Sequence, residues 1–126
     1  MSIHRFTDSR REPRISVDAK YTDVRARRKG ERRYRWTGHL YDVSRAGMRF
    51  EFDEAIDPGT AIEVRLTLPG RGRKPIRLSG RVVRVVEEDG EPGPVRMGMT
   101  FAAFNSAADA QRLDDYLAAH GLRQAA

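Results

Sequence analysis

Apolar and polar residues alternate in a series of short segments along this chain, and this alternation most constrains the fold. A period of two predicts strands with one buried and one wet face. Six segments share it: residues 15–21, about 34–41, 48–52, 62–68, 76–86 and 95–101. The connections between them are short, which favours antiparallel pairing into a small closed barrel or a sandwich.

Details within this pattern give further expectations. Gly80, inside the segment 76–86, predicts a bend or bulge in that strand. The charged stretch 23–33, with Gly30 near its middle, is interpreted as the tip of a hairpin. Trp36 alternates with its neighbours, so we expect it to be packed rather than stacked on a ligand.

The period changes near the C-terminus, where the pattern predicts one helix. Ser106 is a suitable N-cap, with Asp109 three residues later as its partner. One face of the helix is apolar, and Gly121 is the expected end. The apolar face is formed by Ala110, Leu113, Tyr116 and Leu117. We expect this helix to lie on the barrel.

The length of 126 residues fits one domain. We expect an N-terminal basic arm over residues 1–14 that is flexible, a barrel domain with its helix over 15–121, and a tail over 122–126. Without cysteine, the chain has no disulfide, no thiolate metal ligand and no cysteine nucleophile. Because no apolar run is long enough to span a membrane and no apolar leader begins the chain, we expect a cytoplasmic protein.

The net charge of +6 is unevenly distributed. Residues 1–49 carry 14 Lys and Arg against 6 Asp and Glu, whereas residues 50–126 carry 10 against 12. An anionic partner is therefore expected to bind the first part of the chain. Only three of the 24 cations are lysines. Arginine suits bidentate phosphate binding, although a GC-rich gene would also favour arginine.

Two motifs stand out within this basic region. Arg10 and Arg14 form an Arg-x-x-x-Arg pair before the first predicted strand, and Asp42, Ser44 and Gly47 form Asp-x-Ser-x-x-Gly in a connection between strands. Alone, each has a structural explanation: the arginine spacing recurs five times, and Asp, Ser and Gly are common turn formers. A carboxylate among cations, however, favours a nucleotide base over a simple anion.

Taken together, the two motifs resemble those of the PilZ domain family, small β-barrels that bind the bacterial second messenger cyclic di-GMP. The late strand with Gly98 followed by Phe101 is similar to the last strand of that family. The resemblance implies an all-β fold with a C-terminal helix, built as a six-stranded antiparallel barrel.

The resemblance also implies roles for individual residues. Arg10 and Arg14 would contact the phosphates and guanine faces of the ligand, with Arg11 sharing that work. Asp42 would accept a hydrogen bond from a guanine N–H edge, Ser44 would bond nearby, and Gly47 would let the ligand approach the backbone. The implied function is a cyclic di-GMP sensor or adaptor whose arm orders over the ligand and signals to a partner protein.

Two alternatives remain open: a basic β-barrel that binds nucleic acid, and an adaptor that binds a partner protein without ligand. We expect no metal site, because His4, His39 and His120 lack ligand spacing, and no catalysis, because we see no nucleophile paired with a base. The basic cluster between Arg25 and Arg35 is interpreted as a solvated hairpin, with contact to an anion or partner as the alternative.

Overall fold

The computed structural model describes residues 14–17, 22–70, 73–86 and 94–125. Seven strands and one helix follow one another along this part of the chain. They are β1 (Ile15–Ser16), β2 (Asp23–Arg28), β3 (Trp36–Val43), β4 (Gly47–Phe52), β5 (Ala61–Thr67), β6 (Ile76–Val86), β7 (Val95–Phe104) and α2 (Ala107–Ala125).

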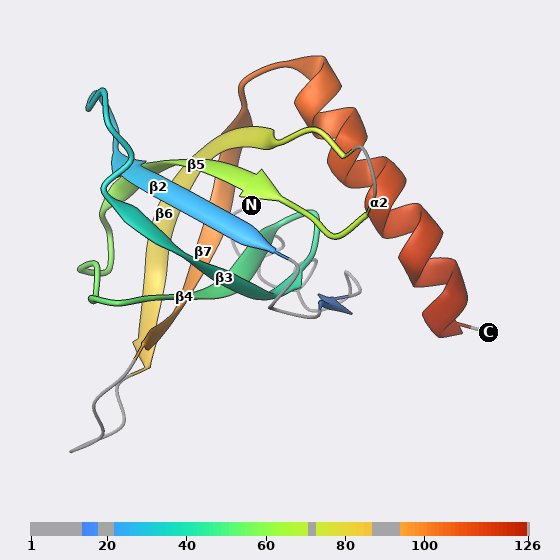
Figure 1. Cartoon of the computed structure of the whole chain (residues 1–126), viewed down its shortest axis with the longest axis horizontal. Helices are drawn as coiled ribbons and strands as arrows, with labels where there is room; N and C mark the ends of the chain where they lie inside the picture. Colours follow the sequence, from blue (N-terminus) through green and yellow to red (C-terminus); the bar gives the residue numbers. More distant parts are fainter. Residues whose placement is uncertain (1–13, 18–21, 71–72, 87–93, 126) are drawn as a thin grey trace, which may run out of the picture.

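Six of the strands close into an antiparallel barrel (Figure 1). The order around it is β3-β2-β5-β6-β7-β4, and pairing between β3 and β4 completes the ring. β2 pairs with the first part of β3, and β1 occupies the same edge of β3 farther along, opposite Asp42 and Val43. The predicted six-stranded antiparallel barrel with a C-terminal helix is confirmed, and β1 is an additional strand.

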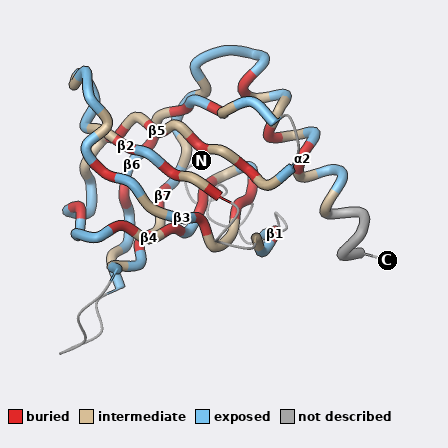
Figure 2. The backbone as a smooth tube through the Cα atoms, viewed as in Figure 1, coloured by how far each residue is buried: buried red, intermediate tan, exposed pale blue. Residues whose placement is uncertain are grey.

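Buried residues recur along the barrel strands, with more exposed residues between them (Figure 2). The buried side chains form the core of the barrel. β5 shows the alternation without interruption, since Ile62, Val64 and Leu66 are buried and the residues between them are half-buried. Trp36 belongs to this core, and its indole N–H donates to Glu54 at 2.7 Å. The expectation that Trp36 is packed is confirmed.

Close strand contacts explain the glycine predicted to mark a bulge. The register of β6 against β7 shifts between Ser79 and Gly80, which confirms the irregularity. A Cβ atom at Gly80 would collide with the carbonyl oxygen of Thr100. Glycine is therefore required by the approach of the neighbouring backbone.

Several predicted strand boundaries are wrong. The strand expected over about 34–41 is β3 at Trp36–Val43, so Asp42 belongs to a strand and not to the connection after it. Residues 23–33 were expected to form a hairpin tip, but Asp23–Arg28 is strand β2, and only the residues around Gly30, with φ of 92°, form the turn. The buried residues of β2, Val24 and Ala26, are small and lie among arginines, so their alternation is faint in the sequence. The strand expected over 15–21 is limited to Ile15–Ser16 in the described residues; 18–21 lie outside them.

The start of α2 is built as expected. Ser106 Oγ accepts from the backbone N–H of Asp109 at 3.1 Å and donates to its carboxylate at 2.6 Å. Burial alone would raise the pKa of Asp109, but bonds from Ser106 and from the backbone N–H of Arg77, with the charge of Arg112 nearby, lower it.

The predicted helix end at Gly121 is wrong, because α2 continues to Ala125. A glycine inside a helix costs only about 1 kcal/mol, which neighbouring strong helix formers offset. Leu113 and Tyr116 are buried, and α2 lies along one side of the barrel against β1, β6 and β7 (Figure 1).

Candidate functional site

Strand pairing brings together residues that are far apart in the sequence at one end of the barrel. β1 pairs with β3 so that Ser16 lies opposite Asp42, and Arg14 then reaches the same carboxylate. Arg14 Nη1 lies 3.2 Å from Asp42 Oδ1. The arginine side chain is 38% exposed and the aspartate 16%, so this ion pair lies at the surface. Arg10 and Arg11 lie outside the described residues.

A β-bulge in β3 sets the direction of Asp42. The register between β3 and β4 shifts between Leu40 and Asp42, which leaves Tyr41 as the extra residue. Leu40 and Val43 are fully buried, whereas Tyr41 and Asp42 are half-buried. Two consecutive side chains therefore face outward, and the carboxylate lies beside Tyr41 on the outer surface.

Arg49 is a residue of this site that the sequence reasoning did not select. It lies directly opposite Asp42 in the β3–β4 pair, and its Nε is 3.4 Å from Asp42 Oδ2. One carboxylate thus holds two arginines, Arg14 on one oxygen and Arg49 on the other. The register of the β3–β4 hairpin was the signal that could have identified Arg49, but the bulge hides that register in the sequence.

Ser44 and Gly47 shape the turn that follows Asp42. Ser44 is buried; its N–H donates to the Gly47 carbonyl at 2.9 Å, and its Oγ accepts from Ala46 N–H at 3.2 Å. A Cβ atom at Gly47 would collide with the carbonyl oxygen of Met99 on β7. Both residues therefore hold the turn against the barrel, while their contact with a ligand remains a prediction.

The turn is also connected to the helix. Arg45 Nε lies 3.2 Å from Asp114 Oδ1 on α2, and the N–H of Phe101 donates to the carbonyl of Ala46 at 2.8 Å. The turn thus contacts both β7 and α2, the helix through an ion pair at the surface.

Comparison with known proteins identifies the family. The family model for the PilZ domain matches residues 8–119, which is most of the chain. The chain belongs to the PilZ domain family. None of the curated protein sequences compared with this PilZ domain matches it.

Solved structures share the fold of this PilZ domain. K. pneumonia MrkH in complex with c-di-GMP has a TM-score of 0.68 at 20% identity, covering 90% of this chain and 52% of MrkH. Bacillus subtilis MotI, an inhibitor of motility, has a TM-score of 0.66 at 17% identity, covering 89% and 50%. The PilZ domain of Escherichia coli YcgR with c-di-GMP has 0.60 at 16%, covering 90% and 92%. The chain thus spans about half the length of MotI and MrkH.

A glycine on β7, Gly98, lies between two arginines near the paired charges of this PilZ domain. Arg49 on β4 pairs with Gly98 on β7, and Gly98 pairs with Arg84 on β6. A Cβ atom at Gly98 would meet Arg84 Cβ at 3.8 Å, an ordinary contact. Packing therefore does not require glycine here, in contrast to Gly47. The result is one position without a side chain, between Arg49 and Arg84, about two strand spacings, or roughly 10 Å, from Asp42.

A polar cluster flanks the same face of the barrel. The Tyr41 hydroxyl donates to Glu51 Oε2 at 2.5 Å, and the Arg96 guanidinium lies 4.9 Å from the centre of the Tyr41 ring. Burial and the bond to Glu51 raise the pKa of Tyr41, so its hydroxyl stays protonated at neutral pH. Glu51 and Arg96 face each other across β4 and β7.

The face can therefore bind an anion that also offers hydrogen-bond donors. Arginines supply the positive charge, and Asp42 supplies an acceptor that repels phosphate. Among the residues that the structure describes, no three His, Asp or Glu side chains are placed to hold a metal ion. No described helix is long and apolar enough to cross a membrane.

Proposed function

We propose that this PilZ domain binds cyclic di-GMP on the face that carries Arg14, Asp42 and Arg49. The observation that supports this most is the double ion pair of Asp42, with arginines at 3.2 Å and 3.4 Å on its two oxygens. A guanidinium pairs bidentately with phosphate and also matches the O6 and N7 acceptors of guanine. A carboxylate accepts hydrogen bonds from the N–H groups on the opposite edge of guanine.

The ion pairs prepare the site before the ligand arrives. Asp42 restrains two long side chains in positions on the outer surface, so less rotamer entropy is lost on binding. Both arginines remain partly exposed, at 38% and 60%, and can exchange a carboxylate contact for a phosphate contact. Arg10 and Arg11, which precede the described residues, would supply the remaining contacts to phosphate and base.

Gly98 and the turn residues complete the proposed site. The missing side chain at Gly98 would leave space against β7 for part of a purine ring, between Arg49 and Arg84. Ser44 and Gly47 act here by fixing the turn, and we propose that they also border the ligand.

Signalling to a partner protein is the second part of the proposal. The arm over residues 1–14 would order across the ligand at a cost of about 1–2 kcal/mol per residue fixed. Arg14 precedes β1, which contacts α2, and Arg45 of the turn bonds Asp114 of α2. A ligand that contacts Arg14 and the turn therefore touches two elements that support the helix, and the partner would recognise the changed surface. A cytoplasmic location in a bacterium fits this proposal.

Calorimetric titration with cyclic di-GMP tests the function, with linear GMP and AMP dinucleotides as specificity controls. Arg14→Ala should weaken binding on the order of 10- to 100-fold, since one charge-assisted hydrogen bond contributes roughly 1.5–3 kcal/mol. Arg32→Ala, on the opposite end of the barrel, removes the same charge and should change affinity by less than about twofold. Equal losses in the two variants would indicate diffuse electrostatics and contradict the site.

A further inference from the structure

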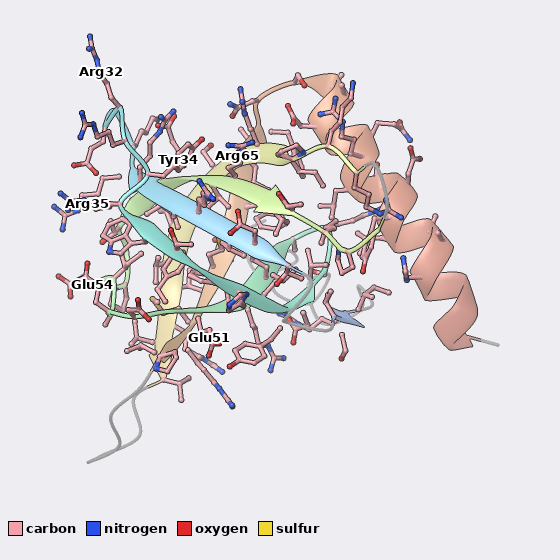
Figure 3. All side chains as sticks on the ribbon, viewed as in Figure 1. Arg32, Tyr34, Arg35, Glu51, Glu54 and Arg65 are labelled. Carbon is pink, nitrogen blue, oxygen red and sulfur yellow. The ribbon has the colours of Figure 1, made fainter. Side chains whose placement is uncertain are left out.

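The tip of the hairpin between β2 and β3, residues 28–35, carries a concentration of positive charge that the nucleotide site does not use. Its five cations accompany a single carboxylate, Glu31, and all five are exposed. They are Arg28, Lys29, Arg32, Arg33 and Arg35. Figure 3 shows Arg32 at the end of the tip, pointing away from the barrel.

Few of these charges are paired with a carboxylate. Arg35 is 3.5 Å from Glu31, but within the described part of the chain no carboxylate forms an ion pair with Arg28, Lys29, Arg32 or Arg33. Like charges held close together raise the energy of the folded state. Local stability therefore does not explain the composition of the tip.

The positive field extends onto the barrel wall. Arg25 on β2 lies directly opposite Arg65 on β5, and like charges in that position destabilise a sheet. Figure 3 places Arg65 on the same side of the barrel as the hairpin. Arg25 has Asp23 at 3.0 Å as an ion-pair partner, and Arg65 has none among the described residues. The tip, this pair and Arg27, which lies on β2 between Arg25 and the tip, form one surface, which we call the hairpin face.

The aromatic groups of the hairpin face indicate the class of partner. Arg27 lies over the ring of Tyr34 at 4.6 Å, while Arg28 and Arg35 lie over Trp36 at 5.9 Å and 5.3 Å. Nucleic-acid bases stack on open aromatic faces, and these faces are covered by guanidinium groups of the same chain.

The carboxylates that lie among these cations also favour a protein partner over a nucleic acid. Asp23, Glu31 and Glu63 pair with cations of the hairpin face at 3.0–3.5 Å. The continuous phosphate backbone of a nucleic acid would be repelled by these negative charges. A protein segment, by contrast, can place its carboxylates next to the four cations that have no carboxylate partner. We propose that the hairpin face is a docking surface for an acidic segment of a partner protein.

This surface and the nucleotide site lie far enough apart to be occupied together. Trp36 begins β3 and Asp42 is its next-to-last residue, six residues or about 20 Å away. That distance exceeds the Debye length of about 8 Å at physiological salt, so charges at one site are screened from the other. The inference is therefore independent of cyclic di-GMP binding.

Fluorescence anisotropy with a labelled peptide of alternating glutamate and serine tests the proposal, at about 0.15 M salt. The tip variant Arg32→Gln/Arg33→Gln should bind roughly five- to thirtyfold more weakly than the wild type. The control variant Lys74→Gln/Arg84→Gln removes two exposed charges outside the hairpin and should lose less than about twofold. Thermal unfolding should show the tip variant at least as stable as the wild type, because repulsion is reduced.

Backbone amide shifts of the wild-type protein give a readout that needs no variant, and the peptide should perturb residues 28–35 first. Equal losses in the two variants, shifts outside the hairpin face, or no binding at about 1 mM peptide would overturn the proposal. So would tighter binding of a labelled DNA duplex that depends on Arg32 and Arg33, since that result would assign the surface to nucleic acid.

Discussion

Replacing Asp42 by asparagine distinguishes a site that recognises guanine from a site that only attracts anions, because the two kinds of site predict changes in ligand affinity of opposite sign. The substitution keeps the shape of the side chain and removes its charge. It releases Arg14 and Arg49 from their ion pairs at 3.2 Å and 3.4 Å and raises the formal net charge from +6 to +7. A simple anion site would then bind more tightly.

The magnitude follows from the contacts of this carboxylate. A hydrogen bond from guanine to a charged acceptor contributes roughly 1.5–3 kcal/mol. Because Asp42 is partly exposed, at 16%, we take the lower end of that range, which corresponds to about tenfold. The ion pairs themselves lie at the surface and contribute about 0–1 kcal/mol each to stability, so the variant should remain folded.

Calorimetry with cyclic di-GMP measures the effect, and inorganic phosphate serves as the control anion. We expect Asp42→Asn to bind cyclic di-GMP about tenfold more weakly and phosphate no more weakly than the wild type. Unchanged or tighter binding of cyclic di-GMP by a folded variant would refute the role of Asp42 in recognising the base.

Three further outcomes are expected. Gly98→Ala should weaken cyclic di-GMP binding roughly tenfold in calorimetry. Its free energy of unfolding should stay equal or rise by about 0.5–1 kcal/mol, since a methyl group fits at this position; a loss of stability would contradict the space at Gly98. Gly47→Ala should destabilise the fold by about 1–3 kcal/mol in denaturant unfolding, because its Cβ meets the Met99 carbonyl; wild-type stability would disprove that contact. The pKa of Asp109 is lowered by folding, so its contribution to stability is present above the unfolded pKa of about 3.9 and is lost as pH falls through the folded pKa. The melting temperature of Asp109→Asn, measured by circular dichroism, should therefore decrease less below about pH 4 than that of the wild type. The same decrease in both proteins would contradict this role of Asp109.

The strands with strong alternation were predictable because their signal is local. β6 begins and ends at the predicted residues, and the Ser106 cap of α2 lies where expected. The faint strand β2 was missed because its inward residues Val24 and Ala26 are small and most of its outward residues are arginines. A short-range hydrophobic pattern reports burial only where the buried side chains are large.

Two of the three charged residues of the candidate site could be foreseen, and the third could not. Arg14 and Asp42 belong to motifs visible in the sequence, and the structure brings these two side chains into contact. Arg49 was passed over as one of many arginines, because nothing local marks it. Its place opposite Asp42 depends on the bulge at Tyr41.

The sequence by itself determined the elements of this protein: its alternating strands, its capped helix and the turn that follows Asp42. These depend on side-chain periodicity and local backbone hydrogen bonds, which neighbouring residues supply. Only the tertiary structure decided which cations share the Asp42 carboxylate. Arg14 precedes Asp42 by 28 residues in the sequence, and the pairing of β1 with β3 brings the two together. Arg49 lies opposite Asp42 because the bulge shifts the register between β3 and β4. Pairing and register are fixed when the barrel closes on its core, a long-range condition that no short segment encodes.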